Sequence, residues 1–351
     1  MAKFRVGLIG AGVVGRVHAA ALASSSDAIL AGIADISPAA RATADAHRVA
    51  FFADAERLLD SVRPDAVIVA SNNQDHLPSG LACIARGVPV LVEKPIADTL
   101  VAAIQLAEAA ERAGVKLLVG HHRRHSPIVA AARQAIADGR LGRITAIAVS
   151  AMFLKPDQYF DTPWRREAGG GPILINMIHE IDLLRFLCGE IETVQAVRSD
   201  RVRKLPVEDT AAALLHFKSG VVATITLSDA VASPWSWDLV AGEFPGFPRY
   251  DVAPFQITGT EASLGLPNLE LWRYTAVRGW QEKLDRETLP YRPENPFERQ
   301  VRHFCAVLRG DEEPVCGGFD AARTLAATLA VFEAAQSGRA VRPEQTPSAL
   351  R

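Results

Sequence analysis

Three residues of this sequence that could do chemistry stand three apart on one predicted helix: Asn176, His179 and Asp182. Residues 173–187 are otherwise apolar nearly all round, which predicts a buried helix. At about 100° per residue, the three polar side chains share a stripe roughly 120° wide. Polar groups on a buried helix must find hydrogen-bond partners or line a cavity. The stripe therefore indicates either a structural hydrogen-bond network or the wall of a catalytic site.

A lysine that follows an apolar run is the next candidate. Lys94 comes directly after the strand-like residues 88–92 and Glu93, and before a proline. A lysine buried at such a place has a tunable pKa and is suited to polarising a substrate oxygen. His76 follows an earlier apolar run, at residues 66–70, where a histidine taken alone is more often a structural loop residue than a ligand-binding one.

The first predicted elements of the chain surround a glycine motif. A predicted strand at 4–9 leads into Gly10-x-Gly12-x-x-Gly15 and then a helix over 16–23. A second predicted strand, at 29–34, ends at Asp35, twenty residues after Gly15. Strand, glycines, helix and acid together form a dinucleotide-binding fingerprint. The three glycines in turn allow a tight turn, a close approach of the pyrophosphate, and close packing of helix on strand.

The same motif predicts the cofactor. The helix start, at Val13 and Val14, offers free N–H groups and the positive end of the helix dipole to phosphates. Asp35 would accept hydrogen bonds from the ribose hydroxyls and repel a 2′-phosphate, and Ile36 supplies no positive charge. NAD is therefore favoured, while NADP is not excluded.

Alternating strands and helices predict the first domain, residues 1–125. Further strand-like runs at 66–70, 88–92 and 116–120 alternate with helical stretches such as 98–113, which indicates an α/β fold with a parallel sheet. Ligands bind beyond the carboxyl ends of such strands. The polar residues after each run, including those at 71–76, 93–94 and 121–125, are therefore expected on the binding edge.

The pattern changes after residue 125, which predicts a second domain over 126–351. A helix at 126–137 precedes strand-like runs in meander order, which indicates an α+β domain with a large, mostly antiparallel open sheet. These runs are 144–153, 194–199, 211–217, 221–227, 255–258 and 269–273.

We make a separate structural prediction for each of three later parts of the second domain. Two closing helices, at 297–308 and 320–336, are expected to pack back on the first domain. The segment 233–254, rich in proline and aromatic residues, is expected to be an ordered loop that serves an oligomer contact or a pocket wall. The tail at 339–351 is expected to be loosely ordered.

Composition excludes several classes of protein. A formal net charge of −2 gives no electrostatic reason to expect nucleic acid or an anionic membrane as partner. Cys83, Cys188, Cys305 and Cys316 are scattered without a C-x-x-C, which argues against a disulfide framework and a structural zinc site, so no metal is expected. No apolar run approaches the roughly 18 residues of a membrane helix, and the first is too short for a signal peptide. We therefore expect a cytoplasmic enzyme acting on a small molecule.

Four motifs together resemble one family. Residues 7–18, Val92-Glu93-Lys94-Pro95, Trp164-Arg165 before Gly169-Gly170-Gly171, and His179-x-x-Asp182 stand in the order of the Gfo/Idh/MocA family, which includes glucose-fructose oxidoreductase and inositol dehydrogenase. The resemblance implies a nucleotide-binding domain followed by an antiparallel-sheet domain. It also implies hydride transfer between NAD or NADP and a secondary alcohol or ketone of a sugar, inositol or related polyol, in a homodimer or homotetramer.

The resemblance also implies roles for single residues. Lys94 matches the lysine that contacts the reacting oxygen, and His179 matches the histidine that exchanges the hydroxyl proton. Arg124 matches an arginine near the substrate, and Asn176 and Asp182 are assigned to the same site. The residues implied beside the cofactor are Ser71, Asn72, His76, Glu93, Lys94, Trp164 and Arg165.

One position departs from the family pattern. Many members carry an aspartate four residues before the histidine, where this chain has Ile175. Either Asn176 or Asp182 takes over that role, or the substrate differs from the common sugars. The alternatives to a sugar or polyol dehydrogenase are a dehydrogenase of a cyclic diol and a non-catalytic dinucleotide-binding regulator.

Overall fold

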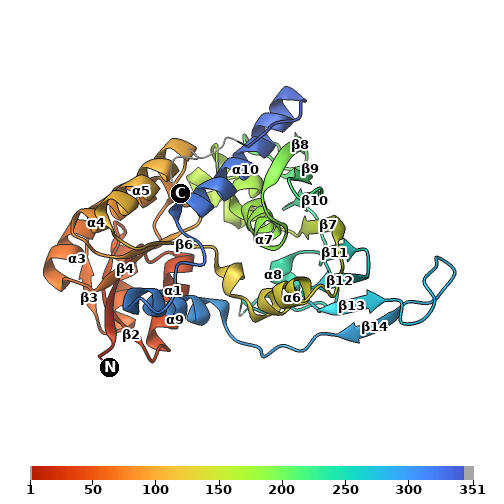
Figure 1. The fold of residues 1–351 in the computed structure, drawn as a ribbon. Helices are drawn as coiled ribbons and strands as arrows, with labels where there is room; N and C mark the ends of the chain where they lie inside the picture. Colours follow the sequence, from red (N-terminus) through yellow and green to blue (C-terminus); the bar gives the residue numbers. More distant parts are fainter. Residues whose placement is uncertain (1, 245, 344–351) are drawn as a thin grey trace. The chain divides into compact units, whose positions relative to one another are not determined.

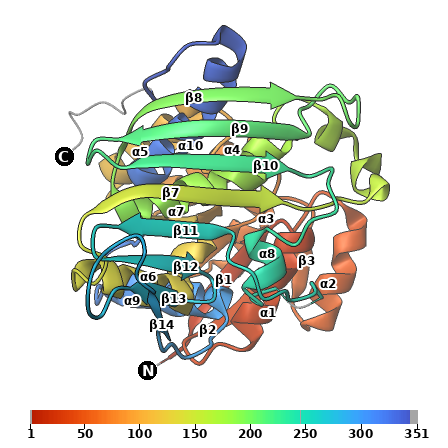
Figure 2. The ribbon, with the colours of Figure 1, turned by 90° about the vertical axis from the view of Figure 1, so that its right-hand side faces the viewer.

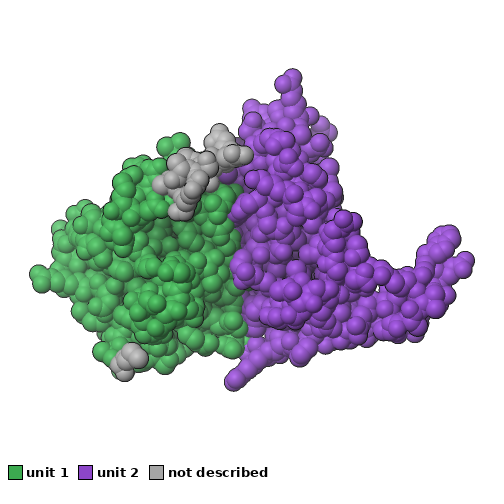
Figure 3. All heavy atoms as spheres, in the orientation of Figure 1, with its two compact units in different colours: residues 1–125, 294–325, 346–351 green, residues 126–293, 326–345 purple. Residues whose placement is uncertain are grey.

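The computed structural model describes residues 2–244 and 246–343, which divide into two compact units (Figure 3). Among the described residues, the first unit holds 2–125 and 294–325. The second unit holds 126–293, apart from residue 245, and 326–343.

The first unit is built on a six-stranded parallel sheet with the strand order β3-β2-β1-β4-β5-β6. Figure 1 labels β2, β3, β4 and β6 of this sheet. Its strands are β1 (Phe4–Ile9), β2 (Ala28–Ala34), β3 (Ala50–Phe52), β4 (Ala66–Val69), β5 (Val90–Glu93) and β6 (Leu117–Gly120). Its helices are α1 (Val13–Ala23), α2 (Arg41–Ala46), α3 (Ala55–Val62), α4 (His76–Ala85), α5 (Leu100–Ala113) and α9 (Pro296–Arg309). This order is that of a doubly wound dinucleotide-binding fold, so the predicted α/β class is confirmed.

Burial explains why most of these strands could be predicted. All four residues of β4, β5 and β6 are buried, as in a parallel sheet covered on both faces, and they form continuous apolar runs in the sequence. The three-residue β3 at the sheet edge is half-buried or exposed and was not predicted.

The second unit contains an eight-stranded sheet with the order β14-β13-β12-β11-β7-β10-β9-β8 (Figure 2). Its strands are β7 (Ile144–Met152), β8 (Ile191–Ser199), β9 (Thr210–Phe217), β10 (Val222–Ser228), β11 (Phe255–Gly259), β12 (Ala262–Leu266), β13 (Glu270–Arg273) and β14 (Asp285–Thr288). Its helices are α6 (Pro127–Ala137), α7 (Ile178–Cys188) and the short α8 (Trp237–Val240), while α10 (Gly318–Ser337) has residues in both units.

The sheet is mostly antiparallel, as predicted. The simple meander order is wrong, however, because β7 lies between β10 and β11 and pairs with β10 in parallel. The carboxyl ends of β7 and β10 therefore lie side by side, next to the amino end of the antiparallel β9.

The core of the second unit lies on one face of this sheet. Residues Ala211, Ala213, Leu215 and Phe217 of β9 alternate with exposed or half-buried residues and pack in one cluster with α6, α7 and the later turns of α10. Helix α7 is buried, as expected for the stretch 173–187, and its apolar side chains pack in this cluster.

Two predicted loops have more structure than expected. Trp237, in the segment 233–254, is buried in the core and packs edge-on against Phe255 at 5.6 Å. In the predicted tail, Val341 exchanges backbone hydrogen bonds of 2.8 Å with Val194 of β8. The rest of that tail prediction, residues 344–351, lies outside the described residues. Within the part of the chain that the structure describes, no helix is long and apolar enough to cross a membrane.

Candidate functional site

The glycine motif between β1 and α1 has the spacing that nucleotide binding requires. Gly10 has φ +91°, and a Cβ there would lie 2.5 Å from the backbone of Ala70. A Cβ on Gly15 would lie 2.1 Å from the Gly10 carbonyl oxygen. Beside Gly12, by contrast, no atom lies within 4 Å of a Cβ position. Gly10 and Gly15 are thus fixed by the fold, whereas Gly12 leaves open space for a ligand to approach the backbone.

The start of α1 fits an anion. Gly12 is the N-cap, no side chain caps the helix, and no acidic residue lies in its first turn. The first N–H groups of a helix, here including those of Val13 and Val14, have no intrahelical acceptor and carry the positive end of the dipole. The residues present therefore fit the pyrophosphate of a dinucleotide.

Asp35 is held at the end of β2 by backbone donors. Its Oδ2 accepts a hydrogen bond from the N–H of Ala11, and its Oδ1 accepts one from the N–H of Ser37, both at 2.7 Å. The carboxylate is thereby fixed next to the glycine motif, while Ile36 is exposed and carries no charge. This arrangement fits an acceptor for ribose hydroxyls and adds no cation for a 2′-phosphate.

Lys94 follows a buried ion pair. Glu93, at the end of β5, lies 2.7 Å from Nε2 of His18 on α1, and both side chains are buried. Burial acts to raise the pKa of Glu93, but the hydrogen bond and charge of His18, together with the charge and backbone N–H of Lys94, outweigh it, so that the pKa is lowered. The second Glu93 oxygen accepts the backbone N–H of Lys94 at 3.1 Å. This pair fixes the backbone from which half-buried Lys94 projects.

Two more residues predicted to bind ligands have partners within the first unit. The His76 ring bridges two strand ends, with Nδ1 2.7 Å from the Pro95 carbonyl oxygen and Nε2 3.1 Å from that of Ser71. Desolvation lowers the pKa of this buried ring. Arg124 donates to the Val315 carbonyl at 3.0 Å and pairs with Asp320. Roles for His76 and Arg124 in ligand binding remain predictions, as do those of Ser71 and of exposed Asn72.

In the second unit, Gly170 and Gly171 are required because the chain passes very close to its neighbours, whereas Gly169 has a left-handed backbone conformation with φ +90°. A Cβ on Gly170 would lie 2.3 Å from the Trp164 carbonyl oxygen, and one on Gly171 would lie 2.3 Å from Oε1 of Glu208. Glu208 accepts the N–H of Ile173 at 3.0 Å and so fixes the start of the helix that follows. The close approach of Gly170 to Trp164 also brings the Trp-Arg pair next to the glycines.

The helix begins with a π turn that was not predicted. Residues Ile173–Met177 form this turn, and α7 continues from Ile178. π turns within helices are rare and occur often at functional sites. Both Ile175 and Asn176 lie in the turn and are half-buried, while His179 and Asp182 lie further along α7 and are buried.

A lysine missed in the sequence reaches Asn176. Nζ of Lys155 donates to Oδ1 of Asn176 at 2.9 Å and lies 3.1 Å from Oδ2 of Asp229. Burial lowers the pKa of Lys155 from its ordinary value, although Asp229 opposes the shift. The signal was present: Lys155 follows the apolar run 144–153 and precedes a proline, as Lys94 does after its own strand.

The predicted Trp164-Arg165 pair lies beside Tyr159, whose ring also contacts Lys155. The Arg165 guanidinium lies 3.9 Å from the centre of the Tyr159 ring and 5.4 Å from that of Trp164. Its Nη1 donates to the Tyr159 carbonyl at 2.8 Å. A role beside the cofactor remains a prediction for both residues.

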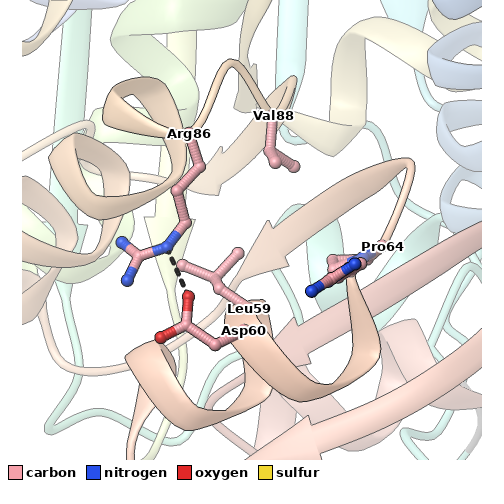
Figure 4. Close-up of a pocket in the computed structure, with 6 residues that line it drawn as sticks. Leu59, Asp60, Pro64, Arg86 and Val88 are labelled. Atoms are coloured by element: carbon pink, nitrogen blue, oxygen red, sulfur yellow. Dashed lines mark hydrogen bonds and ion pairs between the residues drawn. The ribbon is translucent and has the colours of Figure 1, made fainter.

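A surface hollow elsewhere in the first unit has no part in this chemistry. It is lined by Leu59, Asp60, Arg63, Pro64, Arg86 and Val88, with the Arg86–Asp60 ion pair across it at 2.9 Å (Figure 4). Pro64 and Val88 come just before β4 and β5, so the hollow lies where strands begin. Ligands of doubly wound folds bind at the opposite edge, where strands end.

Comparison with known proteins agrees with this geometry. Residues 4–121 match a model described as an oxidoreductase family with an NAD-binding Rossmann fold. Residues 129–264 match the model of the GFO/IDH/MocA C-terminal domain.

Individual relatives cover most of the chain. A 1,5-anhydro-D-fructose reductase of Ensifer adhaerens is 34% identical over 82% of this chain and 83% of its own length. Inositol 2-dehydrogenase 2 of Saccharopolyspora erythraea is 31% identical over 69% and 70%. The WlbA dehydrogenase of Bordetella pertussis, solved in complex with NADH and UDP-GlcNAcA, superposes with a TM-score of 0.80 at 25% identity over 98% and 100%.

Proposed function

The chain belongs to the Gfo/Idh/MocA family of oxidoreductases, and from that premise we propose that it transfers a hydride between NAD and a secondary alcohol or ketone of a sugar, inositol or related polyol. The observation that carries the proposal is the open space at Gly12 beside the fixed Asp35 carboxylate, in a chain whose relatives are sugar and inositol oxidoreductases. The nicotinamide supplies the hydride acceptor or donor, and the protein binds, orients and moves the proton.

In the proposed mechanism, two residues act on the reacting hydroxyl. His179 accepts the hydroxyl proton as general base, since a neutral imidazole has one nitrogen that accepts a proton. The Lys94 ammonium donates to the same oxygen and stabilises the alkoxide that develops as the hydride leaves. Asp182, one turn along α7, orients the histidine.

Removing either group tests this mechanism. We expect His179→Ala and Lys94→Ala each to lower kcat by about 100-fold to 10,000-fold, the usual contribution of general acid–base catalysis. The measurement is NAD reduction, followed by nicotinamide absorbance, over a panel of sugars, polyols, inositols and cyclic diols. Binding of NAD itself to His179→Ala, measured by calorimetry, should change little. Full kcat in both variants on the best substrate would overturn the assignment.

The same panel separates the alternatives. A cyclic diol dehydrogenase is favoured by Ile175, which puts an apolar side chain at the position where many relatives have an acid. Turnover confined to cyclic diols would support that alternative. Tight NAD binding with no turnover of any compound would instead indicate a dinucleotide-binding regulator.

The sheet of the second unit supports a proposed homodimer or homotetramer. Val197, Leu214 and Val222 are exposed, and the strand register puts them on the same face, opposite the core. Exposed apolar side chains gathered on one face of a sheet support an interaction surface there. The proposed location is the cytoplasm, which agrees with four free cysteines.

A further inference from the structure

The parallel pairing of β7 and β10 builds a charged cluster under Asn176. Lys155 follows β7 and Asp229 follows β10, and the Lys155 N–H donates to the Asp229 carbonyl at 2.8 Å. The Lys155 ammonium and the Asp229 carboxylate are both buried and 3.1 Å apart. Arg203 lies on the other side of Asp229, with Nε 3.3 Å from Oδ1. Both carboxylate oxygens of Asp229 are thus paired with cations.

The ammonium of Lys155 decides which way the Asn176 amide faces. An ammonium has donors only, so the Asn176 atom at 2.9 Å must be the carbonyl oxygen. The NH₂ group of Asn176 therefore points away from Lys155. Among the described residues, the structure shows no acceptor for this NH₂ group, and the side chain is half-buried. Asn176 thus presents hydrogen-bond donors, three residues before His179.

Arg165 packs against an aromatic ring that Lys155 also contacts, the ring of Tyr159. The Tyr159 ring lies 4.7 Å from Nζ of Lys155 and 3.9 Å from the Arg165 guanidinium. Nη1 of Arg165 donates to the Tyr159 carbonyl at 2.8 Å, and among the described residues the structure shows no carboxylate paired with this guanidinium. A carboxylate carries the charge opposite to this guanidinium and only accepts hydrogen bonds, so it suits an amide NH₂ group in these surroundings.

We propose that Asn176, held by Lys155, is a specificity-determining residue that donates to a carboxylate of the substrate. The substrate is then an acidic sugar or hydroxy acid rather than a neutral polyol. This inference rests on the proposed function and specifies its substrate class. Lys155 is a positioning residue, because it acts through the orientation of the amide.

The test compares matched acids and neutral compounds. Galacturonate is paired with galactose, and gluconate with glucitol, in NAD-reduction assays that give kcat/KM for each compound. For the wild type we expect the acid to exceed its neutral partner. Asn176→Asp replaces the donor by an acceptor, so the acid-to-neutral ratio should fall by about 10-fold to 100-fold. Lys155→Met removes the ammonium that orients the Asn176 amide. The acid-to-neutral ratio should therefore fall in this variant too, but by less than in Asn176→Asp.

Two controls separate specificity from damage. Gln281→Glu adds the same charge at an exposed residue between β13 and β14 and should leave the ratio unchanged. Thermal melting shows whether each variant folds. A uniform loss of kcat/KM for both members of every pair would indicate a structural role and overturn the inference.

A binding arm separates this inference from the proposed function. The melting temperature of the protein with saturating NAD is measured with each of the four probe compounds. If no compound is oxidised but the acids alone stabilise the wild type, and not Asn176→Asp, the hydride-transfer proposal fails while the carboxylate site stands. If neutral compounds are oxidised and no acid binds or reacts better than its partner, the carboxylate site is wrong and the proposed function stands. If no acid exceeds its partner in either assay, the inference is equally overturned.

Discussion

At the scale of single residues, backbone donors rather than side chains hold the predicted ribose acceptor. Asp35 accepts the N–H groups of Ala11 and Ser37, so its carboxylate is ordered by the fold before any ligand binds. Such preorganisation lowers the entropy lost on binding. It also keeps a negative charge where a 2′-phosphate would have to lie.

Replacing this carboxylate should relax the choice of cofactor. We expect Asp35→Ala to lower the ratio of NAD to NADP affinity by about 10-fold to 100-fold, because a charge-assisted hydrogen bond and a repulsion are both removed. Calorimetric titration with both dinucleotides measures the ratio. Asp45→Ala, at an exposed residue of α2, is the matched control. Tighter binding of NADP than NAD by the wild type, unchanged in Asp35→Ala, would refute the assignment.

The buried Glu93–His18 pair predicts an acid-dependent loss of stability. The folded state lowers the pKa of Glu93 below its ordinary value of 4.5, so the unfolded chain binds the proton more tightly. The stabilisation from this ionised carboxylate is present above about pH 4.5 and is lost as the pH falls through the lower folded value. Glu93→Gln lacks this titration.

Denaturant unfolding between pH 3 and pH 7 checks the effect. We expect the free energy of unfolding of Glu93→Gln to lie below that of the wild type near neutral pH, with the gap narrowing as the pH falls below 4.5. The difference between the two proteins removes the contributions of the other carboxylates. A gap that stays constant with pH would mean that Glu93 titrates alike in folded and unfolded chains.

At the scale of elements, the glycines of the β1–α1 turn meet two different requirements, one of packing and one of ligand binding. Gly15 is required by the fold, because a side chain there would collide with the Gly10 carbonyl. Gly12 faces open space, so a methyl group there costs the folded protein little. The same local sequence thus combines a packing requirement with a binding requirement.

This contrast gives a paired prediction. Gly12→Ala should fold with nearly unchanged stability but bind NAD at least about 10-fold more weakly, because its methyl group occupies the path of the pyrophosphate. Gly15→Ala should lose about 1–3 kcal/mol of unfolding free energy through overpacking. Thermal melts and NAD titrations of both variants separate the effects. Unimpaired NAD binding by Gly12→Ala would place the dinucleotide elsewhere.

The helix after the three glycines shows how an element can be predicted while its detail is not. Its apolar character is visible in the sequence, and α7 is buried. The π turn at Ile173–Met177 depends on how Glu208 and the crowded Gly171 fix the start of the helix, and Glu208 comes from a segment 35 residues later. Periodicity along one segment carries no information about such contacts.

At the scale of the whole molecule, the exposed face of the eight-stranded sheet predicts self-association. We expect the wild type to be a dimer or tetramer by light scattering, and Val197→Glu with Leu214→Glu to give a smaller species, because two charges would have to be buried in the interface. NAD binding by the variant should persist, since the glycine motif is in the other unit. A wild-type monomer at micromolar concentration would rule out this assembly.

The sequence by itself determined the features that depend on neighbours along the chain. The parallel strands of the first unit, the fingerprint from Gly10 to Asp35 and the buried helix around His179 follow from local apolar runs, glycine spacing and helical periodicity. Only the tertiary structure decided the parallel pairing of β7 with β10, and with it the meeting of Lys155, Asn176 and Asp229. Strand order is set by packing and hydrogen bonding between segments far apart in sequence, so the contact between Lys155 and Asn176 could be found only in the folded chain.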